Sequence, residues 1–211
     1  GTIKILRYAL LVITLFMLVS THHAVAASVT FPKDKRERIE TEIQNNMLVH
    51  NIPGMAFALV DADGIVYANG FGLLNIRDDK HAIDVNTNFQ IGSLSKVFVS
   101  LAIMKLQTEG AIHLDQPVAD YLPWFSTQDE QLSKEITIRH LLSHTSGLPD
   151  RLNVHDIEDT DRRQIITKIN EKLRDVQLVG KPGDVYEYTN MNTDLLQLVI
   201  EEVTRTSFTT Y

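Results

Sequence analysis

The chain has 211 residues, of which 44% are hydrophobic and 22% are charged, and it contains no cysteine. This composition is typical of a globular protein with a sizeable core, and it excludes a disulfide framework and thiolate metal ligands. Acidic residues outnumber basic ones by 27 to 20, which gives a formal net charge of -7. The chain therefore lacks the basic surface that nucleic-acid binding requires, and nucleic acid is not expected as a partner.

The first 27 residues have the layout of a signal peptide. Lys4 and Arg7 precede an apolar run, and Ala24-Val25-Ala26 follows it as a small-residue cleavage site. The run is shorter than the about 20 residues that a transmembrane helix needs. We therefore expect residues 1–27 to be removed, leaving residues 28–211 exported, periplasmic or secreted, and without a stable membrane span. An uncleaved signal anchor is the alternative.

The next part of the chain predicts one helix and a β-hairpin. Apolar residues recur at helical spacing over 33–51, and Pro53 with Gly54 ends that pattern. Two apolar runs, 55–60 and 65–71, flank an Asp-Ala-Asp-Gly segment that is typical of a hairpin turn. A hairpin alone is only marginally stable, so further strands or a covering helix are needed. The Gly-Phe-Gly sequence at 70–72 opens no helix, so it is interpreted as a turn and not as a dinucleotide loop.

From residue 93 onward the pattern is mainly helical. Val97, Leu101 and Met104 recur on one face of a helix that begins near Ser93 and stops at Gly110. The same signals predict four more helices: one starting at Asp115 and Pro117, and others over 136–143, 165–176 and 192–205. Only the two strands of the hairpin are convincing, and no internal repeat or low-complexity linker separates the parts.

Ser93 and Lys96 form an S-x-x-K arrangement at the predicted start of a helix. Positions three apart on a helix share a face, so the lysine amine can reach the serine hydroxyl. The helix N-terminus adds free N–H groups and a positive dipole end, and a desolvated lysine there can lose its proton near neutral pH. The pattern predicts a serine nucleophile with a lysine base. A serine cap followed by a solvated lysine is the alternative.

A second candidate is Tyr188-Thr189-Asn190, which comes just before the last predicted helix. A tyrosine here is able to relay a proton between serine, lysine and leaving group, while the Asn190 amide is able to hold both Lys96 and a substrate carbonyl. The alternative is a strand edge with an asparagine turn before a helix cap. Taken without the serine and lysine, the triplet favours that alternative.

Together these motifs resemble the serine β-lactamase and penicillin-binding protein superfamily, specifically its branch of class C β-lactamases, DD-carboxypeptidases and esterases. The resemblance extends to the order and spacing of segments across essentially the whole chain after the predicted signal. Those segments are 88–96, 109–110, 114–118, 121–123, 136–148 and 182–196.

The resemblance implies an α/β (α+β) fold, in which an antiparallel sheet flanked by helices joins a helical domain and the site lies in the cleft between them. It implies that Ser93 is acylated, with Lys96 as its base, Tyr188 as the proton shuttle and Asn190 as the substrate-binding amide. The implied substrates are β-lactams, peptidoglycan-like D-Ala-D-Ala peptides or esters, and no metal or organic cofactor is implied. The residues do not choose among these substrates, and they do not indicate an oligomeric state.

The chain departs from the superfamily pattern at two places. Tyr188-Thr189-Asn190 stands where Tyr-Ser-Asn or Tyr-Ala-Asn is usual, which is a mild change. The third motif, a Lys-Thr-Gly or His-x-Gly on a strand that supplies a second oxyanion donor, does not occur after Asn190. We therefore expect residues 28–211 to be an incomplete domain that lacks the C-terminal strands of its sheet. The rival hypothesis is a non-catalytic protein: a penicillin-recognising sensor, a binding domain or an inactive fragment.

His140 and His144 are four residues apart and would share one helical face, as the histidines of some metal sites do. No glutamate follows His140 in an H-E-x-x-H pattern, and the sequence indicates no third ligand. Helix capping or the packing of a loop is therefore the preferred interpretation of both histidines.

Overall fold

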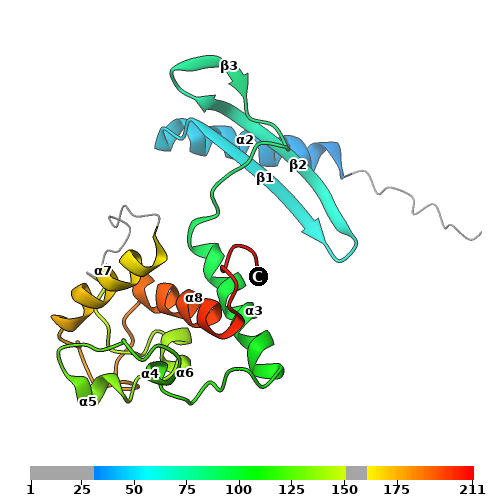
Figure 1. The fold of residues 1–211 in the computed structure, drawn as a ribbon. Helices are drawn as coiled ribbons and strands as arrows, with labels where there is room; N and C mark the ends of the chain where they lie inside the picture. The colour runs from blue at the N-terminus through cyan, green and yellow to red at the C-terminus, as the bar shows by residue number, and fades with distance from the viewer. Residues whose placement is uncertain (1–30, 151–160) are drawn as a thin grey trace, which may run out of the picture. The chain divides into compact units, whose positions relative to one another are not determined.

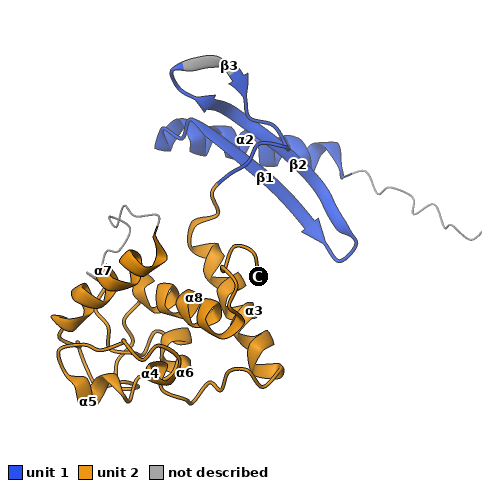
Figure 2. Cartoon of the chain, in the orientation of Figure 1, with its two compact units in different colours: residues 1–89 blue, residues 90–211 orange. Residues whose placement is uncertain are grey.

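The computed structural model describes residues 31–150 and 161–211, with the backbone alone at 78–80 (Figure 1). The predicted signal peptide, residues 1–27, lies outside the described residues. The chain divides into two compact units, residues 1–89 and 90–211 (Figure 2). Within the described part of the chain, no helix combines the length and the apolar character needed to cross a bilayer. The two units are described in turn.

In unit 1, residues 1–89, the described part contains one long helix and a three-stranded antiparallel sheet. Its elements are α2 (Lys33–His50), β1 (Gly54–Asp61), β2 (Gly64–Asn75) and β3 (Asp78–Ala82), and the sheet has the order β1-β2-β3. The predicted helix and hairpin are both confirmed. The hairpin turn is held by Asp61, whose Oδ1 accepts hydrogen bonds from the backbone N–H groups of Asp63 and Gly64 at 2.9 and 3.1 Å.

The prediction of a turn at 70–72 is wrong, because β2 continues through these residues to Asn75. Gly70 and Gly72 allow two other backbone segments to lie close against β2. A Cβ on Gly70 would lie 2.3 Å from the carbonyl oxygen of Ile83, and one on Gly72 would lie 2.2 Å from that of Pro53. The strand β3, which was not predicted, leads back along β2 to Ile83, whose N–H donates to the Gly72 carbonyl at 3.0 Å.

Unit 2, residues 90–211, is helical in the part that the structure describes. Its elements are the 3₁₀ turn η1 (Gly92–Leu94) and the helices α3 (Ser95–Thr108), α4 (Val118–Tyr121), α5 (Glu130–Ser133), α6 (Ile138–Leu142), α7 (Arg162–Arg174) and α8 (Asn190–Thr204). All five helices predicted from residue 93 onward are confirmed, while α5 was not predicted. The short α5 depends on Asp129, whose carboxylate caps its first N–H groups.

The core of unit 2 forms where α3, α4 and α6 contact α8. From α3 it takes Val99, Ile103 and Leu106, and from α8 it takes Met191, Leu195, Leu196, Val199 and Ile200. The helix α3 was predicted from an apolar face formed by Val97, Leu101 and Met104, but this face is not the buried one. The three side chains are 56%, 60% and 46% exposed. Apolar residues therefore occupy more than one side of α3, and the core of unit 2 uses the side that carries Val99.

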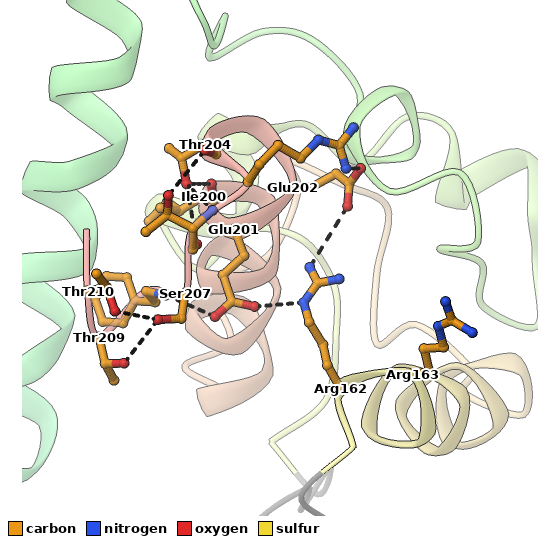
Figure 3. A network of polar contacts seen from close by, with 12 residues as sticks. Arg162, Arg163, Ile200, Glu201, Glu202, Thr204, Ser207, Thr209 and Thr210 are labelled. Carbon is orange, nitrogen blue, oxygen red and sulfur yellow. Dashed lines mark hydrogen bonds and ion pairs between the residues drawn. The ribbon is translucent and has the colours of Figure 1, made fainter.

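A polar network joins the start of α7 to the end of α8 (Figure 3). Arg162 Nε lies 3.1 Å from Glu201 Oε2, and the Glu201 Oε1 atom accepts a hydrogen bond from the backbone N–H of Phe208 at 2.9 Å. One carboxylate thus connects α7 with the segment that follows α8. The network fixes the C-terminal end of α8, while the candidate site lies at the N-terminal end of that helix.

Candidate functional site

Ser93 lies in the 3₁₀ turn that leads directly into α3. The residue before it, Gly92, has a φ of +55°, a left-handed conformation that few residues other than glycine adopt easily. This conformation gives the chain a sharp entry into the helix, and the Ser93 side chain is exposed. The backbone N–H groups at such a helix start have no acceptor within the helix, so the Ser93 amide is placed where an oxyanion could be bound.

The next turn of helix brings Lys96 to the serine. Lys96 Nζ lies 3.2 Å from Ser93 Oγ and 2.7 Å from Asn190 Oδ1, so it contacts both the candidate nucleophile and the start of α8. The amine is held from two directions, by Ser93 in the preceding turn and by Asn190, which lies 94 positions beyond Lys96 in the chain. The packing of α3 on α8 therefore aims Lys96 at Ser93, and it adds a second anchor to the local spacing of the S-x-x-K pattern.

The first turn of α8 supplies the other two predicted site residues. Thr189 caps this helix through a hydrogen bond from Met191 N to its side chain, and it leaves Tyr188 just outside the helix and Asn190 as its first residue. The Tyr188 hydroxyl donates to Ser93 Oγ at 3.0 Å. The structure therefore brings all four predicted residues together, with Ser93 Oγ contacted by both Lys96 and Tyr188.

The Lys96 ammonium also sets the electrostatics of the tyrosine. Lys96 Nζ is 5.1 Å from the centre of the Tyr188 ring. Interaction with Lys96, followed by the hydrogen bond to Ser93, lowers the pKa of the Tyr188 phenol below its ordinary value, although partial desolvation and the charge of Asp150 act in the opposite direction. A phenol of lowered pKa gives up its proton more readily at neutral pH, which favours its use as a proton shuttle.

The two histidines have separate environments. His140 completes the capping box of α6: its Nδ1 accepts a hydrogen bond from Thr137 N at 3.2 Å, which confirms the capping interpretation. His144 lies in the turn after α6, with its ring centre 4.5 Å from that of Tyr188. The interpretation of His144 as part of a packed loop fits this environment, but its contact with the site was not predicted, because nothing in the local sequence links it to Tyr188. Within the described residues, no group of three or more His, Asp or Glu side chains could hold a metal ion.

The geometry thus combines a mixed α/β fold with a helix-start serine that a lysine and a tyrosine both contact. The sequence profile of the β-lactamase family matches residues 38–211, and the chain belongs to that family. Its fold is accordingly that of a serine hydrolase, as the family resemblance implied.

Individual relatives agree with this assignment. The protein flp of Staphylococcus aureus strain MW2 is 33% identical over 178 residues, which are 84% of this chain and 35% of that protein. The octameric penicillin-binding protein homologue from Pyrococcus abyssi superposes with a TM-score of 0.70 at 29% identity, over 83% of this chain and 40% of that one. A class C β-lactamase gives a TM-score of 0.70 at 26% identity, over 88% of this chain and 48% of that one. The chain spans about a third of the curated relative and less than half of either solved structure.

Proposed function

We propose that the protein is a serine hydrolase that works through an acyl-enzyme on Ser93. The observation that carries this proposal is the pair of contacts at Ser93 Oγ, with Lys96 Nζ at 3.2 Å and the Tyr188 hydroxyl at 3.0 Å. A serine hydroxyl is a weak nucleophile unless a base lies within hydrogen-bonding reach. Here Lys96 lies within that reach as the base, and Tyr188 lies beside it to relay the proton. Membership of the β-lactamase family supports the same reaction class.

In the proposed acylation, Lys96 first gives up its ammonium proton to solvent and then accepts the proton from Ser93 as Oγ attacks the substrate carbonyl. The new C–O bond forms as the carbonyl π bond opens, and the Ser93 N–H at the helix start stabilises the resulting oxyanion. Tyr188 passes a proton from Lys96 to the leaving nitrogen or oxygen, whose bond to carbon then breaks. Water attacks the acyl-enzyme in the second step, and the same groups return the proton to Ser93.

Asn190 has the role of orienting both the base and the substrate. Its Oδ1 accepts from Lys96 Nζ at 2.7 Å, which fixes the plane of the amide. The Nδ2 group at the other end of the amide is then directed to a different partner, and a substrate carbonyl or carboxylate is an acceptor of the right kind. We propose β-lactams, D-Ala-D-Ala-type peptides or esters as the substrate class.

Intact-mass spectrometry of the folded chain tests the proposal. Incubation with benzylpenicillin should add the full mass of the drug, because ring opening releases no leaving group, and incubation with a fluorophosphonate should add the phosphonyl group with loss of fluoride. Both adducts should vanish in Ser93→Ala. The neighbouring Ser95→Ala variant is the matched control and should keep them. An adduct that persists in Ser93→Ala, or a folded wild-type chain that neither probe modifies, would contradict the assignment.

The lifetime of the penicillin adduct separates the hydrolase from its rival, a penicillin-recognising sensor. Release of the opened drug within the assay, with return of the unmodified mass, is expected of a hydrolase. A stable adduct would favour the sensor, since that protein is acylated through the same residues but does not complete the second step.

We also propose that the protein is exported. This proposal rests on the sequence of residues 1–27, where two basic residues, a short apolar run and Ala24-Val25-Ala26 occur in the order of a signal peptide. Expression of the chain with a bacterial export system should yield a product whose N-terminus is residue 27 or 28. An uncleaved N-terminus in the membrane fraction would favour the signal anchor instead.

A further inference from the structure

His144 lies directly beside the site but is not one of the four residues to which we give a chemical role. It is in the turn that follows α6, with a φ of +56°, a conformation uncommon for residues other than glycine. Its ring packs on Tyr188 at 4.5 Å between centres, and Tyr186 meets it edge-on at 6.2 Å. The backbone N–H of Glu187 donates to the His144 carbonyl at 2.9 Å. The turn is therefore joined to the segment that carries Tyr188 by both ring packing and backbone pairing.

The imidazole is held by donors from the first turn of α8. The Nδ1 atom of His144 lies 3.0 Å from Asn192 Nδ2 and also accepts from the backbone N–H of Thr189 at 3.4 Å. A backbone N–H can only donate, so Nδ1 is the acceptor and the ring proton belongs on Nε2. Asn192 is itself oriented by Ser146, whose hydroxyl donates to Asn192 Oδ1 at 2.6 Å.

Most of this network is buried. Ser146, Thr189 and Asn192 are all buried polar residues, so a partner lost from the network is not replaced easily by water. The network connects the turn after α6 to the residues on either side of Asn190. The network therefore helps to fix the positions of Tyr188 and Asn190, the two site residues at the start of α8.

The charges around His144 favour its neutral form. Burial, followed by the charge of Lys96, lowers the pKa of His144 below its ordinary value. Among the described residues, the other ionisable side chains that contact it are Tyr186 and Tyr188, while Asp150 acts on Tyr188 and the neighbouring Glu187 pairs with His144 through its backbone. Neutral imidazole is the form able to accept at Nδ1, and imidazolium would lose both hydrogen bonds.

We propose that His144 is a positioning residue for the acylation of Ser93, and that as a neutral acceptor it fixes Tyr188 and the first turn of α8 relative to Lys96. The proposal rests on the proposed function, since positioning matters only if Ser93 reacts. Two variants separate the acceptor from the ring. His144→Phe keeps an aromatic ring against Tyr188 but removes Nδ1. His144→Asn keeps an acceptor near that position, tolerates the left-handed backbone and does not titrate.

The rate of fluorophosphonate labelling is the first readout. His144→Phe should lower it by roughly tenfold to a hundredfold, which is the cost of misplacing reacting groups by about an ångström. His144→Asn should retain most of the rate. His140→Phe is the matched control, because it removes an Nδ1 acceptor from α6, the helix just before His144, and leaves the contacts of Tyr188 in place. This variant should label at the wild-type rate. Equal labelling by wild type and His144→Phe would overturn the proposal.

A second readout does not depend on activity. In protein with ¹³C-labelled tyrosine and histidine, the Tyr188 phenol signal, assigned with Tyr188→Phe, should titrate below its ordinary range in wild type and closer to that range in His144→Phe. As pH falls, protonation of His144 should occur below its ordinary pKa, and in the wild-type chain the Tyr188 signal should shift at that same pH. This shift needs no variant to fold. A Tyr188 signal that does not respond to His144 protonation would overturn the proposal.

The two readouts also separate this proposal from the one on which it rests. A wild-type chain that is never labelled would overturn the acyl-enzyme and with it a role of His144 in acylation, while the coupled titration of His144 and Tyr188 would still show that His144 holds Tyr188 in place. If wild type and His144→Phe are labelled at the same rate, and Tyr188 does not respond to the protonation of His144, the acyl-enzyme stands and His144 has no role in the site.

Discussion

The two units of the chain differ in the size of their buried apolar cores. In unit 1, residues 1–89, the buried apolar side chains among the described residues are Ile43, Phe71 and Ile83. Unit 2, residues 90–211, has a continuous core in which Val99, Ile103 and the apolar face of α8 meet. All four candidate site residues belong to unit 2, at the N-terminal ends of α3 and α8.

This difference indicates where the positions of the site residues are determined. Ser93 and Lys96 start one helix of the unit 2 core, and Tyr188 and Asn190 start the other. Because α3 and α8 pack on one another through buried residues, a change in that packing alters the distance between the two halves of the site. The small core of unit 1 contains none of these four residues.

The largest expected effect comes from Lys96→Ala. The variant removes the proposed base and the contact that joins Ser93 to Asn190, so the rate of Ser93 labelling should fall by about 10²–10⁴-fold. Without the nearby ammonium, the pKa of Tyr188 should return toward its ordinary value, which a tyrosine titration would detect. Lys105→Ala, on the same helix but outside the site, should label normally. A Lys96→Ala variant that labels at the wild-type rate would remove lysine from the proposed mechanism.

Next in size is the cost of a cavity in the unit 2 core. Leu195 is fully buried in α8, and Leu195→Ala should lower the free energy of unfolding by about 2–5 kcal/mol. The same variant should slow Ser93 labelling in the fraction that remains folded, because α8 carries Asn190. Urea unfolding followed by circular dichroism gives the first quantity, and mass spectrometry gives the second.

Ile43→Ala in unit 1 is the matched comparison for that cavity. Ile43 is the buried residue of α2, and its truncation should also reduce stability, but the labelling rate of the folded protein should stay unchanged. If Ile43→Ala and Leu195→Ala slow labelling equally, the positions of the site residues do not depend on unit 2 alone.

The long elements of the fold were predictable from local patterns. Helices such as α2, α7 and α8 have apolar residues at helical spacing with stop signals after them, and the hairpin has a turn sequence between two apolar runs. Other features depend on partners distant in the chain. The glycines at 70 and 72 are required by the backbones of Ile83 and Pro53, and no local pattern distinguishes that requirement from a turn.

The candidate site divides in the same way. Ser93 and Lys96 share one turn of helix, so their spacing alone predicted that they would meet. Tyr188 and Asn190 were associated with them only through the family resemblance, since the contact spans more than 90 residues. The contact of His144 with Tyr188 could not be predicted, because it arises from the packing of a turn against the start of α8.

A smaller effect is expected from the buried network behind the site. Ser146→Ala leaves the Oδ1 atom of Asn192 and the backbone N–H of Leu148 without the hydroxyl that both contact. The free energy of unfolding should fall by about 1–3 kcal/mol, which is the cost of an unsatisfied buried polar group. Ser143→Ala removes an exposed hydroxyl from the same stretch and should change stability little. Equal losses from the two serines would show that burial does not strengthen this network.

The smallest expected loss of stability comes from breaking an exposed ion pair. Its comparison with Ser146→Ala separates surface from buried polar contacts within unit 2. Arg139 contacts Asp115 with two hydrogen bonds of 2.7 and 2.9 Å, yet the two side chains are 55% and 77% exposed. Exposed pairs are screened by salt, and at 1 M the screening length is only about 3 Å. Arg139→Ala should therefore cost less stability than Ser146→Ala at low salt, and the loss should nearly disappear in 1 M sodium chloride. The loss of stability caused by Ser146→Ala should persist in 1 M sodium chloride, because a neutral buried hydrogen bond is not screened by salt. A salt-insensitive loss at Arg139 would mean that this side chain stabilises unit 2 by packing and not by its charge.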